Sequence, residues 1–391
     1  MEDAPWWPSG LLERTAEHAT SDLVRTPWGL LTHWDIETAM NEVWWEDLFD
    51  GAQTWGEWPQ NVASVSLQHE SRAGRWVNLD TRYTALLLPF ATGQDLSMLA
   101  RYTPWCEALE PCDLLLPIGG MFAKGGDYVV LFPFHEPLGV EALEGHQRSL
   151  AQGLTKVHAA LDFDATPNTE RRWNDRLKAM EDELQTKTLW RAPHTDQTVG
   201  LPPVHVSLEA ITRNDERLLF VPQPRSVADY LLCEEDRLPS LAGIMHLEQA
   251  WAKHTPLSED QRQAWLATWE EHAPKRWSSG RALSTALGGA WVWRYHANIL
   301  QLANATLYGD STEEERCMSW LSDVSRLQAR LGNLRFLKSG LWVGVIGVVV
   351  AWFGTQWSTF SSGGGIAIAA SSVAFAWLSN RLYWRMDPPP Y

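Results

Sequence analysis

The histidines, serines and acidic residues that could do chemistry stand outside the spacings of known catalytic motifs. His205 and Ser207 place a base two residues from a hydroxyl, but no Gly-x-Ser-x-Gly segment surrounds the serine. His135-Glu136, His158 and Glu270 to His272 lack the His-Glu-x-x-His spacing or any other spacing of zinc ligands. No Gly-x-x-x-x-Gly-Lys-Ser/Thr loop is present to bind nucleotide phosphates. We therefore expect no metal site from these residues and interpret them as surface or core residues.

Asp162, Asp164 and Thr166 resemble the Asp-x-Asp-x-Thr motif of haloacid-dehalogenase-like phosphatases. In that motif one aspartate attacks phosphorus and the other acts as acid and base, and the motif must follow a buried parallel strand. The apolar residues before Asp162 instead recur at helical spacing. The sequence therefore predicts a helix-to-loop transition at residues 162–166 rather than a phosphatase site.

The composition of the 391 residues predicts a folded core, because 45% are hydrophobic and 20% are charged. The 32 basic and 48 acidic residues give a net charge of −16, which argues against a nucleic-acid partner. The four cysteines have no Cys-x-x-Cys spacing, so we expect reduced thiols and no structural zinc. The N-terminus lacks a basic segment followed by an apolar stretch, so we expect no cleavable signal peptide.

The elements that must position any site begin with two N-terminal regions. Residues 1–60 are rich in tryptophan, of which the chain has 24, and we expect an extension that packs on the domain behind it. Residues 61–137 contain apolar runs separated by turn residues, which predicts an antiparallel sheet. Within this region, residues 96–109 predict one helix, and Lys124 to Asp127 predict the turn of a hairpin.

Residues 138–310 have a mostly helical pattern. The segment 150–161 carries one apolar face, formed by Leu150, Leu154, Val157 and Leu161. One extended stretch, residues 204–224, contains two apolar runs around a polar turn and predicts a hairpin. A small antiparallel sheet lobe followed by a mostly helical lobe corresponds to an α+β fold class.

Several segments together resemble the protein-kinase-like fold, and in detail the aminoglycoside-phosphotransferase-like kinases. Residues 150–161 are similar to the family's helix before the catalytic loop, which commonly ends in Leu-His-Ala. His205 to Leu208 resemble its His-x-Asp-Leu loop, and residues 217–224 resemble its strand ending in Asp-Phe-Gly. Residues 227–251 resemble the turn and helix that follow. The resemblance covers residues 60–300 and implies a two-lobed kinase-like fold.

The groups that catalyse phosphoryl transfer are missing from the matching positions. Transfer needs a loop aspartate, a metal-binding aspartate after the strand and a lysine on the phosphates. Ser207 stands in place of the loop aspartate, and Pro222 in place of the metal aspartate. Ala210 or Thr212 replaces the asparagine for a second Mg²⁺, and the candidate lysine strand, residues 85–90, has no lysine. The resemblance therefore implies a pseudokinase with no catalytic residues, no cofactor and no metal.

Two alternatives stay open for this domain. If the resemblance is false, the same residues form a buried hairpin in another α+β domain. If the domain is an atypical active kinase for a small molecule or a protein, displaced acids such as Glu209, Asp215 or Glu216 would carry the chemistry.

Residues 311–338 predict an amphipathic helix that connects this domain to the C-terminal segment. Ser311 and Glu314 have the spacing of a capping box. An apolar stripe recurs at spacings of four and three, formed by Trp320, Val324, Leu327, Leu331 and Leu334. We expect this stripe to pack on its own domain, with a short coiled-coil stalk as the alternative.

Residues 340–384 predict a transmembrane helical hairpin. Gly340 to Trp357 have no charged residue and are long enough to cross a hydrocarbon core of about 30 Å, and Ile366 to Leu378 form a second uncharged run. A buried hairpin of a soluble protein is the alternative. Basic residues flank both runs outside the loop, which places the N-terminal domain and the C-terminus in the cytoplasm. The expected membrane-interface residues are Lys338, Trp342, Trp357, Trp377, Arg381 and Trp384.

Gly340, Gly344 and Gly347 form a small-residue surface at which helices could pack, within the hairpin or between copies. The spans hold no ionisable residue, so we expect an anchor or assembly element rather than a transport pathway. The sequence thus predicts a membrane-anchored, catalytically inactive kinase-like protein. We expect it to act as a binding, scaffold or regulatory module, with protein partners or further copies of itself, at the cytoplasmic face of a bacterial inner membrane that it crosses more than once. A structural subunit of a membrane assembly is the alternative.

Overall fold

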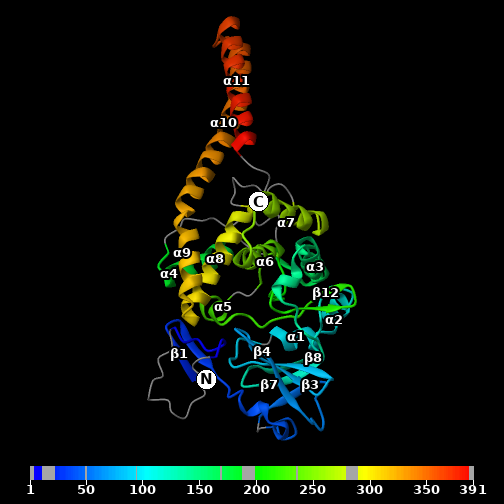
Figure 1. The fold of residues 1–391 in the computed structure, drawn as a ribbon. Helices are drawn as coiled ribbons and strands as arrows, with labels where there is room; N and C mark the ends of the chain where they lie inside the picture. The colour runs from blue at the N-terminus through cyan, green and yellow to red at the C-terminus, as the bar shows by residue number, and fades with distance from the viewer. Residues whose placement is uncertain are drawn as a thin grey trace.

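The structure is a computed structural model that describes residues 4–10, 23–48, 51–93, 95–167, 170–186, 199–234, 237–278 and 289–386. A body with a sheet lobe and a helical lobe carries a long helical hairpin that projects away from it (Figure 1). This mixed architecture, with one lobe of strands and one of helices, is the one that the sequence predicts.

The sheet lobe is built on a six-stranded antiparallel sheet with the strand order β3-β7-β8-β6-β5-β4. Its strands are β3 (Gln53–Gly56), β4 (Val65–Ser71), β5 (Gly74–Leu79), β6 (Tyr83–Leu87), β7 (Gly119–Ala123) and β8 (Gly126–Pro133). Two-stranded ribbons are formed by β1 (Leu23–Thr26) with β2 (Gly29–Thr32), β9 (Thr166–Pro167) with β10 (Val199–Gly200), and β11 (Ile211–Asn214) with β12 (Arg217–Phe220). Because β3 pairs with β7, the sheet begins before the boundary expected at residue 61.

Both faces of the six-stranded sheet are buried, as the central strand β8 shows. Val130 belongs to the core shared with the helical lobe, whereas Val129 belongs to a second core with the tryptophan-rich N-terminal region. In the second core, Trp34 stacks on Tyr128 with ring centroids 5.0 Å apart. The Tyr128 hydroxyl also donates a hydrogen bond to the carbonyl of Asp35 at 2.7 Å. The tryptophan-rich region therefore covers one face of the sheet.

The helices of the body are α1 (Asp95–Arg101), α2 (Thr103–Leu109), α3 (Gln147–Ala160), α4 (Glu170–Glu183), α5 (Val227–Leu232), α6 (Ser240–His254), α7 (Glu259–His272), α8 (Gly289–Tyr308) and α9 (Ser311–Ser322). The apolar face predicted for residues 150–161 is confirmed, since its four residues are at most 1% exposed. The helix-to-loop transition at residues 162–166 is also confirmed, because α3 ends at Ala160 and a 3-10 turn covers Asp162–Asp164.

The single helix predicted over residues 96–109 is wrong. The chain forms α1 and α2 with a break at Tyr102, the N-cap of α2. Pro104 lies in the first turn of α2, where its missing N–H does no harm, but it cannot donate the hydrogen bond that would continue α1.

The connecting segment differs from its prediction at two places. Asp310 rather than Ser311 caps α9, because the Asp310 carboxylate accepts a hydrogen bond from the Glu313 N–H at 3.1 Å. The helix is then interrupted at Asp323, so it divides into α9 and α10 (Val324–Gln356). Val324 is buried in the body, which keeps the lower end of α10 attached to it.

The apolar stripe of this segment is described in part. Trp320 packs on the second core and Leu334 is fully buried, whereas the side chains of Leu327 and Leu331 lie outside the described part of the chain. Since Trp320 and Val324 both join the core of the body, the lower part of the stripe packs on its own domain.

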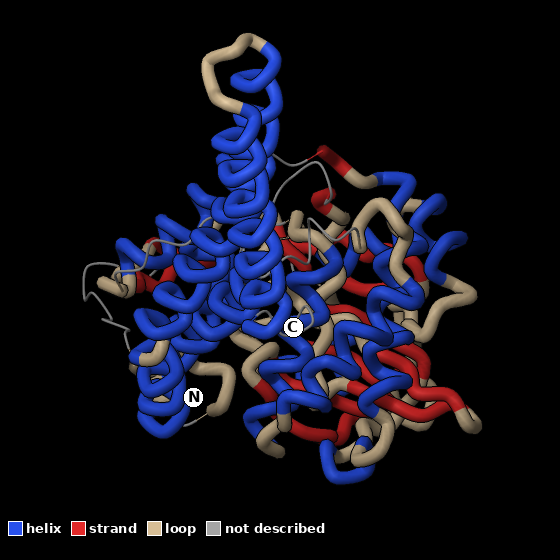
Figure 2. The backbone as a smooth tube through the Cα atoms, turned by 90° about the horizontal axis from the view of Figure 1, so that it is seen from above, coloured by secondary structure: helices blue, strands red, loops and turns tan. Residues whose placement is uncertain are grey.

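The hairpin is formed by α10 and α11 (Ser362–Met386), which rise clear of the body with a loop at their tip (Figure 2). Only 17% of the most apolar 18-residue window is buried in the helix that contains α10. In α11 the buried share of the corresponding window is 11%. A core helix of a soluble protein would be mostly buried, and a signal sequence would lie near the N-terminus. Both helices are long and apolar enough to cross a membrane.

The glycines expected at a helix interface lie on the side of α10 that faces α11. A Cβ added at Gly340 would meet the Ser379 Oγ at 2.7 Å, and one at Gly344 would meet the Ala376 Cβ at 2.6 Å. These glycines therefore let the two helices of the hairpin approach each other closely.

Replacing Gly344 by alanine is expected to weaken the hairpin, because the added methyl group must push α11 away. We expect a loss of about 1–3 kcal/mol, measured as the SDS mole fraction at which the full-length protein unfolds in mixed micelles. The matched control is Gly332→Ala, where nothing lies within 4 Å of an added Cβ. It should gain up to about 1 kcal/mol from helix propensity. Equal effects of the two changes would contradict the close packing.

Candidate binding site between the lobes

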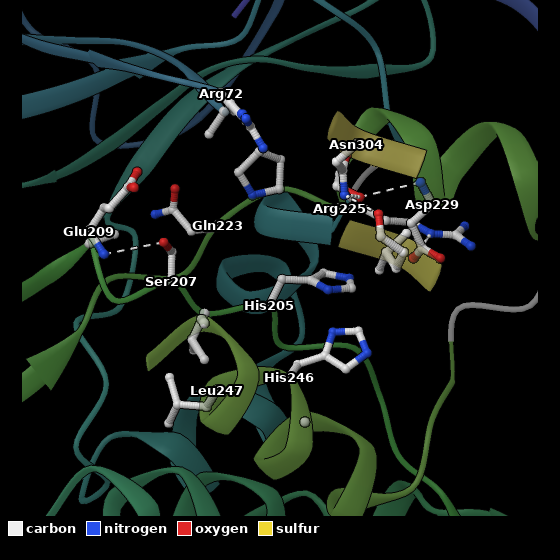
Figure 3. A pocket seen from close by; sticks show the side chains of 18 of the residues that line it. Arg72, His205, Ser207, Glu209, Gln223, Arg225, Asp229, His246, Leu247 and Asn304 are labelled. Carbon is white, nitrogen blue, oxygen red and sulfur yellow. Dashed lines mark hydrogen bonds and ion pairs between the residues drawn. The ribbon is translucent and has the colours of Figure 1, made fainter. Parts of the chain in front are cut away.

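A cavity of about 370 Å³ lies between the sheet lobe and the helical lobe. Its lining comes from the β4–β5 turn, the loop of residues 201–210, the segment 223–229, and helices α6 and α8 (Figure 3). This volume is in the range of small-molecule sites. The loop that the sequence compares with a kinase catalytic loop therefore forms part of a cavity wall.

The loop is fixed to the segment after β12 by backbone hydrogen bonds. The Gln223 N–H donates to the His205 carbonyl at 2.8 Å, and the Val221 N–H donates to the Ala210 carbonyl at 2.8 Å. The Ser207 hydroxyl accepts a hydrogen bond from the Glu209 N–H at 3.2 Å. These contacts set the positions of His205 and Ser207 on the wall.

The positions that the sequence compares with kinase catalytic motifs divide into two groups. His205, Ser207 and Ala210 line the cavity, whereas Thr212 and Pro222 do not. The Thr212 hydroxyl donates instead to the Glu136 carbonyl at 2.8 Å. Gln223, which faces His205 across an antiparallel bridge, lines the cavity in place of Pro222.

A buried ionic cluster closes the inner end of the cavity. The Asp229 carboxylate on α5 pairs with the Arg176 guanidinium through Oδ1 and with the Arg225 Nε through Oδ2, the latter at 2.8 Å. Burial alone would raise the pKa of Asp229, but the charges of Arg176 and Arg225 outweigh it and hold the pKa well below its usual range. Asp229 is therefore ionised and occupied by two cations.

Two histidines extend this cluster as a chain of hydrogen bonds. The Arg176 Nε–H donates to the His296 Nε2 at 2.8 Å, and the His296 Nδ1 lies 2.8 Å from the His246 Nε2. Arginine always donates, so the Nε2 of His296 is an acceptor and its proton is on Nδ1. That proton is donated to the His246 Nε2, which leaves the proton of His246 on Nδ1.

Both imidazoles of this chain are neutral. Burial lowers the pKa of His246 to about 4, with smaller contributions from nearby charges. Burial, and then the charge of Arg176, lowers the pKa of His296 well below its usual value. The tautomers assigned from the hydrogen bonds therefore apply at neutral pH.

Acidic groups suited to a metal are scarce around this cavity. The acids among its described lining residues are Asp229, Glu209 and Glu313. Asp229 is held by two arginines, Glu313 pairs with Arg316 at 2.8 Å, and Glu209 is exposed. Within the described residues, no group of three His, Cys, Asp or Glu side chains could hold a metal ion.

The turn between β4 and β5 covers the cavity and is fastened to the end of α8. The Arg72 guanidinium pairs with Asp310 at 2.5 Å and lies over the Tyr308 ring, 5.3 Å from its centroid. The Tyr308 hydroxyl donates to the Arg72 carbonyl at 3.3 Å. The sheet lobe is thus tied to the α8–α9 junction across the mouth of the cavity.

The displaced acids considered in the sequence are not gathered at this site. Asp215 and Glu216 form the exposed turn between β11 and β12 and do not line the cavity, and Glu209 alone of the three does. Arg176, Asp229, His246 and His296 were not found by sequence reasoning. They stand on four helices, and no local spacing brings them together.

No family model matches the sequence, and no curated protein matches it. Among solved structures, a glucosamine kinase in complex with glucosamine, ADP and inorganic phosphate is similar, with a TM-score of 0.40 and 13% identity over 77% of this chain and 86% of that chain. The Plasmodium vivax ethanolamine kinase has a TM-score of 0.42 and 12% identity over 68% and 83% of the two chains. Choline kinase from Cryptosporidium parvum Iowa II has a TM-score of 0.40 and 9% identity over 75% and 97%. Similarities with TM-scores this low carry no information about activity or substrate.

A third histidine on the cavity wall, His158, is also buried and neutral. Its Nδ1 lies 2.9 Å from the Ser240 Oγ, which accepts a hydrogen bond from the Trp269 Nε1 at 3.0 Å. Burial lowers the pKa of His158 to about 4.

We expect stability to fall as the pH is lowered from 6.5 toward 4. The depressed pKa means that the unfolded chain binds more protons than the folded chain in this window, so stability present above pH 6.5 is lost below it. His158→Gln should flatten the slope by up to about 1.4 kcal/mol per pH unit. The measurement is urea unfolding of the full-length protein in detergent at pH 5–7. The control is His272→Gln at the end of α7; a His158→Gln slope parallel to the wild type would contradict the assignment.

Proposed function

We propose that this protein is a membrane-anchored, kinase-like binding protein that does not transfer phosphate. The observation that carries the proposal is the state of Asp229. Two carboxylates among the described lining residues of the cavity are buried, and both are paired with arginine: Asp229 with Arg176 and Arg225, and Glu313 with Arg316.

The kinase-like reading is supported by the order and position of the elements. A sheet lobe precedes a helical lobe, and the cavity lies between them. The loop containing His205 leads directly into the β11–β12 hairpin, and Gln223 after that hairpin pairs back with His205. This is the arrangement that the resemblance of residues 204–224 to a catalytic loop and its following strands implies.

Phosphoryl transfer depends on positioned cations and a base at the phosphates. Ser207 stands on the loop in place of the aspartate, and Pro222, in place of the metal aspartate, does not line the described cavity, whereas its neighbour Gln223 does. The strand β6 and the residues after it, Leu88 to Phe90, supply no lysine to the wall. The same wall offers hydrogen-bond donors, which suit binding rather than transfer.

The anchoring role is supported by the exposed hairpin. Trp342, Trp357, Trp377 and Trp384 are 59–76% exposed near the ends of the spans, where tryptophan favours a membrane interface. The guanidinium of Arg381 lies over the Trp377 ring, and the ammonium of Lys338 over the Tyr383 ring. The proposed location is a bacterial inner membrane, crossed twice, with the body in the cytoplasm and a protein partner there.

A structural subunit or a homo-oligomer would use the same anchor. We favour the binding role because the cavity contains an ordered polar network at its inner end.

Alkaline carbonate extraction of bacterial membranes is expected to leave the full-length protein in the pellet, because two spans hold it in the bilayer. The topology has its own control. Thr359→Cys at the hairpin tip should react with an impermeant maleimide added to spheroplasts, and Ser322→Cys in α9 should react only after lysis. Release by carbonate, or the opposite labelling pattern, would contradict the proposed anchoring.

Mixing the full-length protein with Mg·ATP is expected to give no transfer and to shift the midpoint of thermal unfolding by less than about 1 °C relative to ATP with EDTA. The matched variant is Glu209→Gln, which removes the exposed acid of the cavity wall. Transfer of labelled phosphate that requires Mg²⁺ and is lost in Glu209→Gln would establish the atypical kinase instead.

A further inference from the structure

Two imidazoles at the inner end of the cavity have polar atoms without a partner among the described residues. The Nε2 of His205 is buried and makes no hydrogen bond. The Nδ1 of His246 has no acceptor within the described part of the chain. Both residues line the cavity, and their rings are drawn near one another in Figure 3. A buried polar atom without a partner costs free energy, so a ligand that pairs with the His205 Nε2 would be favoured.

The chain from Arg176 determines what His246 presents to the cavity. Arg176 donates to His296, and His296 donates to His246, so the His246 Nδ1 carries a proton and must donate in turn. The His205 Nε2 can carry a proton as well, because that ring is free to adopt this tautomer. Both histidines line this cavity, so each can offer an N–H donor to an acceptor, such as an oxygen atom, that is bound in it.

The cationic lining favours an acceptor with a negative charge. Arg72, Arg176, Arg225 and Lys253 line the cavity together with three acids, in a chain where acidic residues outnumber basic ones by 48 to 32. The apolar walls, which include Trp76, Leu208 and Leu247, leave room for the remainder of a small molecule.

The ligand should be soluble rather than a lipid headgroup. The cavity reaches α9 at Glu313, close to the start of that helix. The first apolar span begins at Gly340, 27 residues further along helix α9 and helix α10, which is about 40 Å at 1.5 Å per residue. A path of this length favours a soluble ligand over a headgroup at the membrane surface.

We propose that the inner end of the cavity binds the oxyanion of a small soluble molecule, a carboxylate or a phosphate, between His205 and His246. This proposal deepens the proposed binding function and rests on it. His246 and His205 contact the ligand, whereas His296 is a positioning residue that fixes the tautomer of His246.

The test titrates full-length protein in nonionic detergent with inorganic phosphate, and separately with acetate, at constant ionic strength. At several times the dissociation constant, either anion that binds should raise the midpoint of thermal unfolding by about 2–4 °C. His246→Leu and His205→Leu should abolish the shift. His246→Asn, whose amide can replace the Nδ1–H donor, and the remote control His272→Gln should retain it. An equal shift in the wild type and His246→Leu, or a shift with neutral acetamide but neither anion, would overturn the proposal.

The pH dependence gives a second readout that does not depend on the variants folding. Because burial keeps His246 a neutral donor between pH 6 and 8, its hydrogen bond to acetate should persist across this range. If the site needed an imidazolium, the affinity for acetate would instead fall about tenfold per pH unit above the pKa of that group. That result would overturn the assigned hydrogen-bond chain from Arg176 through His296 to His246. Transfer from Mg·ATP would refute the proposed function while leaving the anion result standing, so the two failures are distinguishable.

Discussion

The carboxylate of Asp229 joins the parts of the helical lobe that form the inner end of the cleft. It pairs with Arg176 from α4 and Arg225 from the segment before α5, and Arg176 continues to His296 on α8. A buried carboxylate between two arginines is stable only as a complete set, since removing one partner leaves an uncompensated charge at a cost of about 3–5 kcal/mol. The positions of α4, α5 and α8 around the cavity therefore depend on one another through this group.

The chemistry of the cavity follows from the same cluster. Arg176 cannot give up its proton, so the His296 Nε2 must accept a hydrogen bond from it. The His296 Nδ1–H then donates to the His246 Nε2, which leaves the His246 Nδ1 as a donor. Burial and the nearby positive charge keep these rings neutral, and a neutral ring with a fixed tautomer can donate an N–H hydrogen bond. The buried lining carboxylates, Asp229 and Glu313, are each paired with arginine.

Local patterns predict the elements of this protein well and predict its site poorly. The continuous apolar run of β8, the apolar face of α3 and the two uncharged apolar runs of the hairpin could be recognised in the sequence, because each depends on residues a few positions apart. The break between α1 and α2 could have been found from Pro104, and the Asp310 cap from its position before the helix. The buried cluster around Asp229 could not be predicted in this way. Arg176 is 53 residues from Asp229 and 120 residues from His296, and only the packing of separate helices brings them together.

The cleft and the hairpin are connected through a short path in the chain. The β4–β5 turn over the cavity is held by Arg72 to Asp310, which is also the N-cap of α9. From there α9 leads to Asp323 and α10, and α10 continues into the first span. The break at Asp323 lies just before Val324, which is still buried in the body, and further along α10 Gly340 and Gly344 pack on α11. A displacement of α9 relative to the sheet lobe must therefore either break the Arg72 contact or move the turn that covers the cavity, whereas bending at Asp323 can occur without disturbing it.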